Sequence, residues 1–505
     1  MKFNLKNIFA LLLVGMMTGG CMGFLDTDPN NGQIPEDVAP QEAINGMLYL
    51  MFERNYYGRN TTIFGEIGTS SVILDPQGSR FLQFHAMDKS ANLPEPDAPV
   101  SGSTEIQAFQ QMYAVLANVN RFLEREDITE DQRGQVLFLR AYVHMDLLRF
   151  YGSVPYVTSV ISPSEHPAKD DMATIYAGVL ADLEEAKGLI TNTSSAYPTA
   201  EACDALATRV YLQKSVEEFA DKGNSNFEGN RSDLEQVVAH GQLVSTSIVG
   251  AEDWYNFFQG YGSNAEAIFE LVVTGNQSQG ANNLGRMYMR DEQGGGYGQF
   301  QAGYDFYNTF NHDMDVRSEM FLVRTHDNGD EKNIPSNKKD VWEVYNGKFF
   351  ECDDTWGLHA PKVLRASEVA LNVAEALVKL DRQGEAAEWV KKVRMNRIVL
   401  PEEPTADQQA YYDEQITNFN SADLEDVLLE RQKELAYEGY AVADLRRNNL
   451  PSEYRFTGKA TDFGDAISLD DEMAIVPAGD KNFWMPIPMS EINANENINE
   501  NNWGY

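Results

Sequence analysis

The sequence predicts a mainly α-helical fold in which helices pack as pairs and strands are few and short. Apolar residues recur every three or four positions through many segments, which is the period of one face of an α-helix. Hydrophobic residues make up 43% of the chain, enough for a packed core. One stretch, 265–271, is predicted to be a short strand. The length of 505 residues allows one large domain or two to three modest ones.

The clearest predicted helical unit covers residues 364–397. One apolar stripe runs from Ala366 to Leu377, a turn follows at 381–384, and a second stripe runs from Ala386 to Val393. Small alanines along these stripes let two helices approach closely. The 34 residues of the unit are the length of a tetratricopeptide helix pair, so the sequence predicts tetratricopeptide-type packing here.

Further segments share the helical period, and loop-rich connections separate them. The predicted helices lie near 43–50 and at 106–123, 132–149, 175–190, 200–219 and 424–438. Thr199, after a turn at Tyr197 and Pro198, is predicted to cap the helix that starts at 200. His144 and Cys203 lie on helical faces, and we interpret both as core residues rather than metal ligands.

The segment 430–447 combines charged and apolar side chains in a way that predicts buried ion pairs. One helical face carries leucines together with Arg431 and Glu438. A charge on such a face needs a partner, because an unpaired buried charge is very costly. Arg431 can pair with Glu434 within the helix, and Glu375 is a predicted partner for a C-terminal arginine. We favour a structural ion network over a catalytic acid–base set, since the segment contains neither His nor Cys.

Composition and motifs argue against several classes of function. A net charge of -37 repels phosphate backbones, so we expect no nucleic-acid binding. The chain carries no Walker A, G-x-S-x-G, H-E-x-x-H or C-x-x-C motif, and its seven histidines are scattered. We therefore predict no cofactor, no metal site and no catalytic residues. A pair of glycosidase carboxylates is the open alternative, because the chain has 77 acidic residues.

The first 20 residues have the pattern of an export signal. Lys2 and Lys6 precede an apolar run at 8–17, and small residues at 18–20 lead to Cys21. This order resembles a bacterial lipobox, in which the cysteine becomes the lipidated N-terminus; an ordinary cleavage site beside a cysteine is the alternative. Acyl chains contribute about 0.8 kcal/mol per buried methylene, so several would hold the protein firmly to a membrane. No later run reaches 18 apolar residues.

Two less periodic regions, 60–100 and 286–310, are predicted to be loops that carry aromatic side chains. Loops on a rigid scaffold are where binding groups concentrate. In the second region, three glycines precede Tyr297 and one follows it, which favours a loop that projects the ring. A phosphate-binding loop is the alternative, but no Gly-Lys-Ser/Thr follows. The remaining cysteines, Cys203 and Cys352, make no disulfide framework, and we do not predict that they pair.

Several stretches resemble signatures of the SusD/RagB family, surface lipoproteins of Bacteroides-type bacteria that bind nutrients. ERQKELAYEGYAVADLRR at 430–447 is similar to the family's E-R-R-x-E-L-A-F-E-G-x-R-x-x-D-L-R-R, with Tyr437 for the usual Phe and Ala441 where many members carry Arg. Similar matches are FLDTDP after Cys21, RAYVHMDLLRFYGSVP, RASEVALNVAEA and the closing FWMPIP to NNWGY. The resemblance spans nearly the whole chain, and the order of its motifs makes it specific.

The resemblance implies a mainly α SusD-like fold and a protein that binds rather than cleaves. It implies a lipid-anchored protein of the outer membrane, facing the exterior. Its partners would be a SusC-like TonB-dependent transporter and a glycan ligand. A signal peptide at 1–20 would precede a SusD-like N-terminal region at 21–220 and a SusD/RagB C-terminal region at 221–505. The predicted ligand-binding residues are Asp75, Phe81, His85, Tyr288, Arg290, Tyr297 and Tyr304. A peptide ligand, as in the RagB branch, and a secreted glycoside hydrolase are the alternatives.

Overall fold

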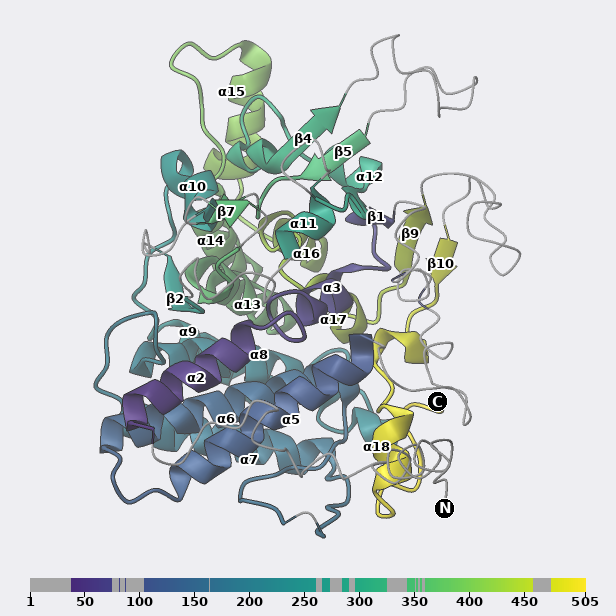
Figure 1. The fold of residues 1–505 in the computed structure, drawn as a ribbon. Coiled ribbons are helices and arrows are strands. Elements are labelled where there is room, and N and C mark those ends of the chain that lie inside the picture. The colour runs from purple at the N-terminus through teal and green to yellow at the C-terminus, as the bar shows by residue number, and fades with distance from the viewer. Residues whose placement is uncertain are drawn as a thin grey trace, which may run out of the picture.

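Helices dominate the computed structural model (Figure 1), which confirms the predicted mainly α fold. The structure describes residues 38–74, 81, 87, 104–162, 164–259, 266–272, 284–289, 296–324, 343–349, 351–352, 355–356, 359–456 and 474–505. The predicted export signal and Cys21 lie outside these residues. Within them, no helix is long and apolar enough to cross a membrane.

The N-terminal helices form one layer, in the lower half of Figure 1. They are α2 (Pro40–Phe52), α5 (Thr104–Leu123), α6 (Glu130–Tyr151), α7 (Met172–Leu189), α8 (Ala200–Glu217) and α9 (Arg231–Gly241). Side chains cap several of these helices. Thr129 and Gln132 form a capping box at the start of α6, and Thr199 accepts from the backbone N–H of Ala202, as predicted. Consecutive helices pack against each other from α5 to α9.

The predicted tetratricopeptide-type pair is confirmed as α13 (Ala366–Lys379) and α14 (Gln383–Arg394). Asp381 turns the chain between them with a φ of 63°. The pair packs with α9 and with α16 (Leu424–Glu434) around a separate apolar cluster. Alanines at 374, 376, 386 and 387 are fully buried there, which lets the helices come close.

Short strands join distant parts of the chain. β1 (Val72–Leu74), β3 (Phe300–Ala302), β9 (Ser452–Phe456) and β10 (Ala474–Val476) form a sheet in the order β10-β9-β1-β3. β1 runs parallel to β9 and antiparallel to β3. The predicted strand at 265–271 is confirmed as β2 (Ala267–Glu270), which pairs with β8 (Lys362–Arg365). Two small hairpins are β4 (Phe321–Arg324) with β5 (Glu343–Asn346), and β6 (Glu351–Cys352) with β7 (Thr355–Trp356).

Two regions predicted as loops contain regular structure. The segment 60–100 includes α3 (Asn60–Glu66) and β1, and the segment 286–310 includes the end of α11 (Leu284–Tyr288), β3 and α12 (Tyr304–Tyr307). The remaining α-helices are α10 (Trp254–Gln259), α15 (Ala406–Tyr412), α17 (Ala441–Arg447) and α18 (Met489–Ala494). Shorter helical turns are η3 (Ala220–Lys222), η4 (Ala251–Asp253), η6 (Val316–Met320), η7 (Asp413–Thr417) and η9 (Lys481–Phe483).

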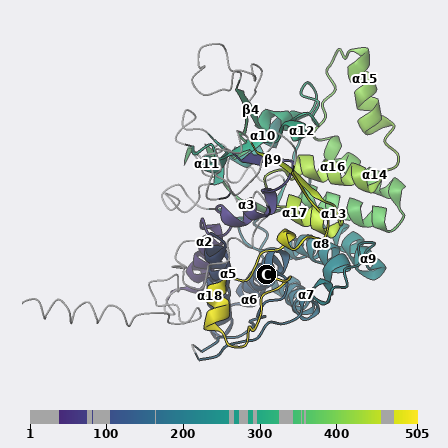
Figure 2. The ribbon, with the colours of Figure 1, turned by 90° about the vertical axis from the view of Figure 1, so that its right-hand side faces the viewer.

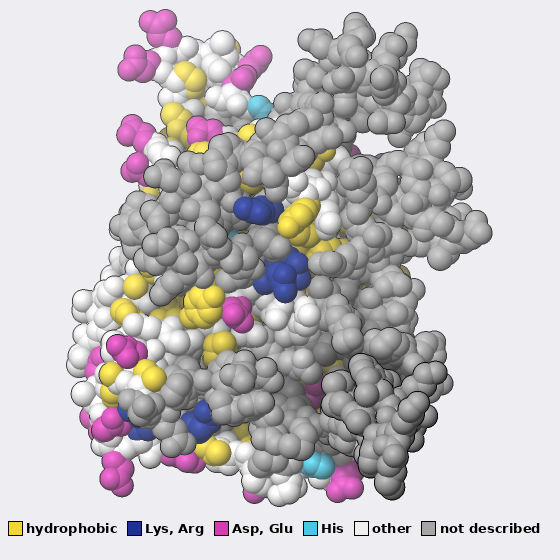
Figure 3. Space-filling view, in the orientation of Figure 1, with side chains coloured by type: hydrophobic (Ala, Val, Ile, Leu, Met, Phe, Trp, Pro, Cys, Tyr) yellow, Lys and Arg dark blue, Asp and Glu magenta, His cyan; other side chains and the backbone are white. Residues whose placement is uncertain are grey.

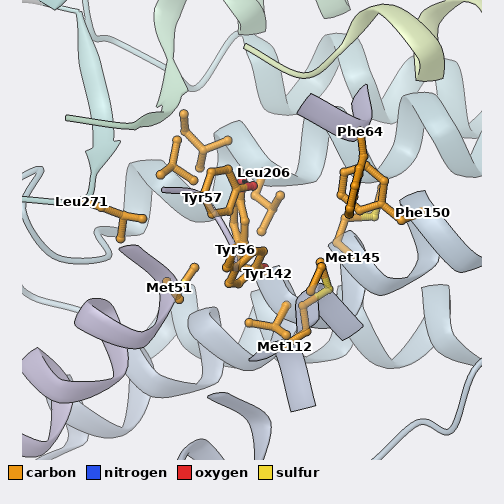
Figure 4. Packing of buried hydrophobic residues seen from close by; sticks show 14 of the residues in the cluster. Met51, Tyr56, Tyr57, Phe64, Met112, Tyr142, Met145, Phe150, Leu206 and Leu271 are labelled. Atoms are coloured by element: carbon orange, nitrogen blue, oxygen red, sulfur yellow. Dashed lines mark hydrogen bonds between the residues drawn. The ribbon is translucent and has the colours of Figure 1, made fainter. Parts of the chain in front are cut away.

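The main core lies between α2, α5, α6 and α8 and contains tyrosines as well as aliphatic residues (Figure 4). Tyr56 and Tyr57 are satisfied there because both hydroxyls donate to Asp146 at 2.8 Å. His144 is fully buried, and burial lowers its pKa to about 3, which confirms a neutral core histidine. Cys203 is buried, which confirms its predicted core position, and its thiol is free.

Candidate ligand-binding site

A buried ion network surrounds Glu434, at the C-terminal end of α16. Its carboxylate accepts from Arg365 at 2.7 Å, from Arg397 at 2.9 Å and from Arg317 at 3.2 Å. All four side chains are at most 1% exposed. Despite burial, which raises the pKa of a carboxyl, the charges of Arg397 and Arg365 hold the pKa of Glu434 well below its usual range.

A second set of ion pairs ties α16 to α17 and α13. The predicted pairing of Arg431 with Glu434 is wrong, because Arg431 instead donates to Asp444 at 2.8 and 2.9 Å. The predicted role of Glu375 is confirmed, since Arg447 donates to it at 2.8 and 2.6 Å. Burial opposes ionisation of Glu375, but the charge of Arg447 lowers its pKa to about 2.

These networks match the structural interpretation of the charged segment 430–447. Each of their side chains is largely covered by protein and paired with an opposite charge, which is what a structural ion network requires. In the part of the chain that the structure describes, no group of three or more His, Cys, Asp or Glu side chains could hold a metal ion.

Tyr297, in the segment that leads into β3, carries an exposed aromatic ring. Its side chain is 53% exposed, which agrees with the prediction that flanking glycines project it. The loop is fastened to α11 because the N–H groups of Tyr297 and Gly298 donate to the carbonyls of Arg286 and Met289, both at 2.6 Å. A Cβ at Gly296 would lie 2.0 Å from the Met289 oxygen, so only glycine fits this close approach. The backbone that carries the ring is therefore held against α11.

Arg286 lies beside Tyr297 and was not among the predicted site residues. Its side chain is exposed on α11, and its carbonyl accepts the Tyr297 N–H. Figure 3 shows basic side chains above and below an apolar one in the area of α11 and α3, on a molecule whose net charge is -37. Sequence reasoning missed Arg286 because no spacing rule connects it to a ring eleven positions later in an irregular loop.

Two of the predicted ligand-binding rings lie in the core instead. Tyr288 and Phe81 are both 0% exposed, and their rings pack on Phe300 of β3 at centroid distances of 5.5 and 5.4 Å. The Tyr437 ring also contacts the Tyr288 ring, with centroids 5.2 Å apart. Because both rings are fully buried, they belong to the core and present no face for stacking. Asp75, His85 and Arg290 lie outside the described residues, as does the side chain of Tyr304, whose backbone starts α12.

Two family models match the chain, one in each half. Residues 324–505 match the model described as SusD family. Residues 23–212 match a model described as starch-binding associating with outer membrane. Together the two matches cover well over half of the sequence and include both ends of the described structure.

Individual proteins show the same relationship. The SusD-like protein P2 of Formosa agariphila is 26% identical over 238 residues, which are 42% of this chain and 45% of that protein. The chain thus matches less than half the length of this relative. A SusD superfamily protein from Bacteroides thetaiotaomicron shares the fold with a TM-score of 0.69 and 22% identity, over 92% of this chain and 98% of that one. A putative sugar binding protein from Bacteroides vulgatus has a TM-score of 0.68 and 21% identity over the same shares. The chain belongs to the SusD/RagB family.

Proposed function

We propose that this protein is a non-enzymatic lipoprotein of the outer membrane that captures a glycan at the cell exterior. It then delivers that glycan to a SusC-type TonB-dependent transporter. The family supports the proposal, because one matching model is described by starch binding and by association with the outer membrane. One protein of the same fold is described as sugar binding.

The observation that carries the proposal is the exposed Tyr297 ring on a loop held against α11. Sugars bind proteins through aromatic rings that stack on their C–H faces and through polar groups that bond their hydroxyls. A ring held in place before binding loses little conformational freedom when the ligand arrives. Arg286, whose carbonyl accepts the Tyr297 N–H, adds the hydrogen-bond donors of an exposed guanidinium. A stacked ring contributes about 0.5–1.5 kcal/mol, so several contacts together give micromolar to millimolar affinity.

Replacing Tyr297 with alanine should weaken glycan binding by about 3- to 10-fold, the equivalent of one lost stacking contact. The mature chain is tested by isothermal titration against a panel of polysaccharides and peptides. Tyr297→Phe keeps the ring and should bind nearly as well as the wild type. Phe219→Ala removes another exposed ring, 43% exposed, and should leave binding unchanged.

Three results would contradict parts of the proposal. Binding of peptides alone would favour the RagB-type alternative. Glycan binding that is indifferent to Tyr297→Ala would place the site elsewhere on the surface. Release of sugar product, abolished by replacing a single carboxylate, would mean that the protein is a glycoside hydrolase.

Replacing Cys21 with alanine should move the protein from the membrane fraction to the soluble fraction. The anchor we propose is the lipid on this cysteine, since no described helix could span a membrane. Fractionation of cells that express the wild type and Cys21→Ala checks this, with Cys203→Ala as the matched control. A Cys21→Ala protein that stays with the membrane would overturn the anchor.

A further inference from the structure

A pocket of about 580 Å³ lies between α16, α17 and the turn that precedes β1. We call it the α16–α17 pocket. Its volume falls in the range of small-molecule sites. Its apolar walls are mostly aliphatic, with Tyr440 as their aromatic residue, and six leucines line it: Leu424, Leu428, Leu429, Leu435, Leu445 and Leu450. In Figure 2, α16 lies to the right of α11, and no residue of α11 or of the Tyr297 loop lines the pocket, so it is separate from that loop.

Glu66, the last residue of α3, also lines the pocket and is only 1% exposed. One carboxylate oxygen accepts from the backbone N–H groups of Gly439 at 2.8 Å and Tyr440 at 3.2 Å. The other oxygen is buried and has no hydrogen-bond partner among the described residues. Buried polar atoms are nearly always hydrogen-bonded, so an unpartnered carboxylate oxygen in a pocket wall indicates a missing donor.

The other polar groups of the pocket decide which donor fits. Arg431 is committed to Asp444, with which it forms two hydrogen bonds, and also donates to Asn372 at 2.7 Å. Gln432 donates to the hydroxyls of Ser70 and Ser71, both at 3.0 Å. The lining therefore offers no uncommitted cation to an anionic ligand, whereas Glu425 adds an exposed acid.

The cation whose charge reaches Glu66 is likewise committed. Lys348 is 0% exposed and donates to Glu438 at 2.6 Å and to the backbone carbonyls of Glu434 and Ala436. Burial raises the pKa of Glu66 to about 7, while the backbone donors lower it. When Glu66 is ionised, a positively charged or neutral hydrogen-bond donor would satisfy the second oxygen, and a carboxylate would be repelled.

We propose that the α16–α17 pocket is a second ligand site, for a small amphiphile with an aliphatic body and a hydrogen-bond-donating head. The leucine walls take the aliphatic body, because removing it from water is favourable in proportion to the apolar area buried. The unpartnered oxygen of Glu66 accepts from the head, an ammonium or a hydroxyl. The proposal is independent of glycan binding at Tyr297.

Three six-carbon probes test this pocket by isothermal titration with the mature chain at about pH 8, where hexylamine is a cation and hexanoate an anion. We expect saturable one-to-one binding of hexylamine and hexan-1-ol. Hexanoate should bind at least about tenfold more weakly than hexylamine, because it cannot donate to Glu66. Equal binding of hexanoate and hexylamine would overturn the role of Glu66, and no saturable binding of any probe would overturn the site.

Two variants locate the binding. Leu428→Trp fills the pocket from its wall and should weaken all probes by at least about tenfold. Glu66→Gln keeps an oxygen for the N–H groups of Gly439 and Tyr440 but presents an amide donor in place of the second oxygen. It should weaken hexylamine about tenfold. Leu243→Trp, at a position 58% exposed and outside the pocket, is the matched control.

Melting temperatures show whether each variant is folded, and Tyr297→Ala should bind all three probes as the wild type does. If the folded Leu428→Trp and Glu66→Gln proteins bind hexylamine normally, the site is not this pocket. A failure of glycan binding would leave this outcome unaffected, so the two proposals can fail separately.

Discussion

Replacing Arg397 with alanine should lower the free energy of unfolding by about 3–5 kcal/mol, the largest effect we expect from removing one charge. Arg397 is fully buried and donates to Glu434 at 2.9 Å, to Glu266 at 3.1 Å and to the carbonyl of Val249 at 2.6 Å. Without it, two buried carboxylates keep only part of their positive partner charge. Urea unfolding, followed by circular dichroism, measures the change.

The expected effect is large because folding has already removed both carboxylates from water, and without Arg397 they would lose a positive partner while staying buried. Arg365 also contacts both Glu266 and Glu434 at 2.7 Å, but one guanidinium cannot replace two. The charge of Arg397 is the main influence that lowers the pKa of Glu434, so its removal should raise that pKa. Arg397→Lys keeps the charge but loses the planar fork, and should fall between alanine and the wild type.

Arg382→Ala is the matched control for this prediction. Arg382 pairs with Glu385 at 2.7 Å and Glu235 at 3.2 Å, but all three side chains are solvent-accessible. Exposed pairs contribute about 0–1 kcal/mol, so this variant should unfold nearly as the wild type does. If Arg397→Ala and Arg382→Ala lost the same stability, the buried network would not be what fixes α16 in place.

The helices could be predicted from the sequence because their apolar period is local. The pair at α13 and α14 and the cap at Thr199 follow from residues within one turn of each other. The strands of the main sheet could not be predicted in the same way. β1, β3 and β10 have three residues each, too few for a period to show, and β1 lies hundreds of residues from its partners β3 and β9.

For the ion pairs too, the sequence predicts what depends on neighbouring residues but not what depends on residues far away in the chain. Charged side chains on an apolar face predict that the segment 430–447 forms buried ion pairs. The sequence pattern does not predict which residues are the partners. Glu434 is close to Arg431 in the sequence, yet Arg431 donates two hydrogen bonds to Asp444 of α17 instead. Glu434 instead accepts from arginines 317, 365 and 397, which come from three segments distant in the sequence.

Of the candidate site, the sequence predicted only the feature that depends on local backbone conformation, namely the exposed ring of Tyr297. Glycines around Tyr297 indicated a projecting ring, and the ring is exposed. Tyr288 and Phe81 stood in equally irregular sequence, but Phe300 and Tyr437 cover them from distant segments. The α16–α17 pocket could not be predicted from the sequence, because its lining residues lie in the segments 66–71 and 424–450, which meet only in the folded chain.

The other large effect we expect is from Gly65→Ala, which should destabilise the protein by about 3 kcal/mol or more. A Cβ on Gly65 would lie 1.9 Å from the carbonyl oxygen of Gly439 and 2.7 Å from its Cα. Backbone atoms cannot rotate away as a side chain can, so α3 and the turn after α16 must separate. That turn is itself constrained, since Gly439 has a φ of 91° and donates to Glu66. Thermal and urea unfolding measure the loss.

Gly188→Ala is the control, and its effect should have the opposite sign. Gly188 also lies in a helix, α7, but nothing stands within 4 Å of the added Cβ. Alanine there should stabilise the protein by about 0.5–1 kcal/mol, since glycine disfavours the helix. If Gly65→Ala left the stability unchanged, the backbone at Gly439 would have room to move away from the added Cβ. If instead it destabilises as expected, α3 and the 439 turn are one packed unit, and hexylamine binding should fall with it because Glu66 takes its position from both.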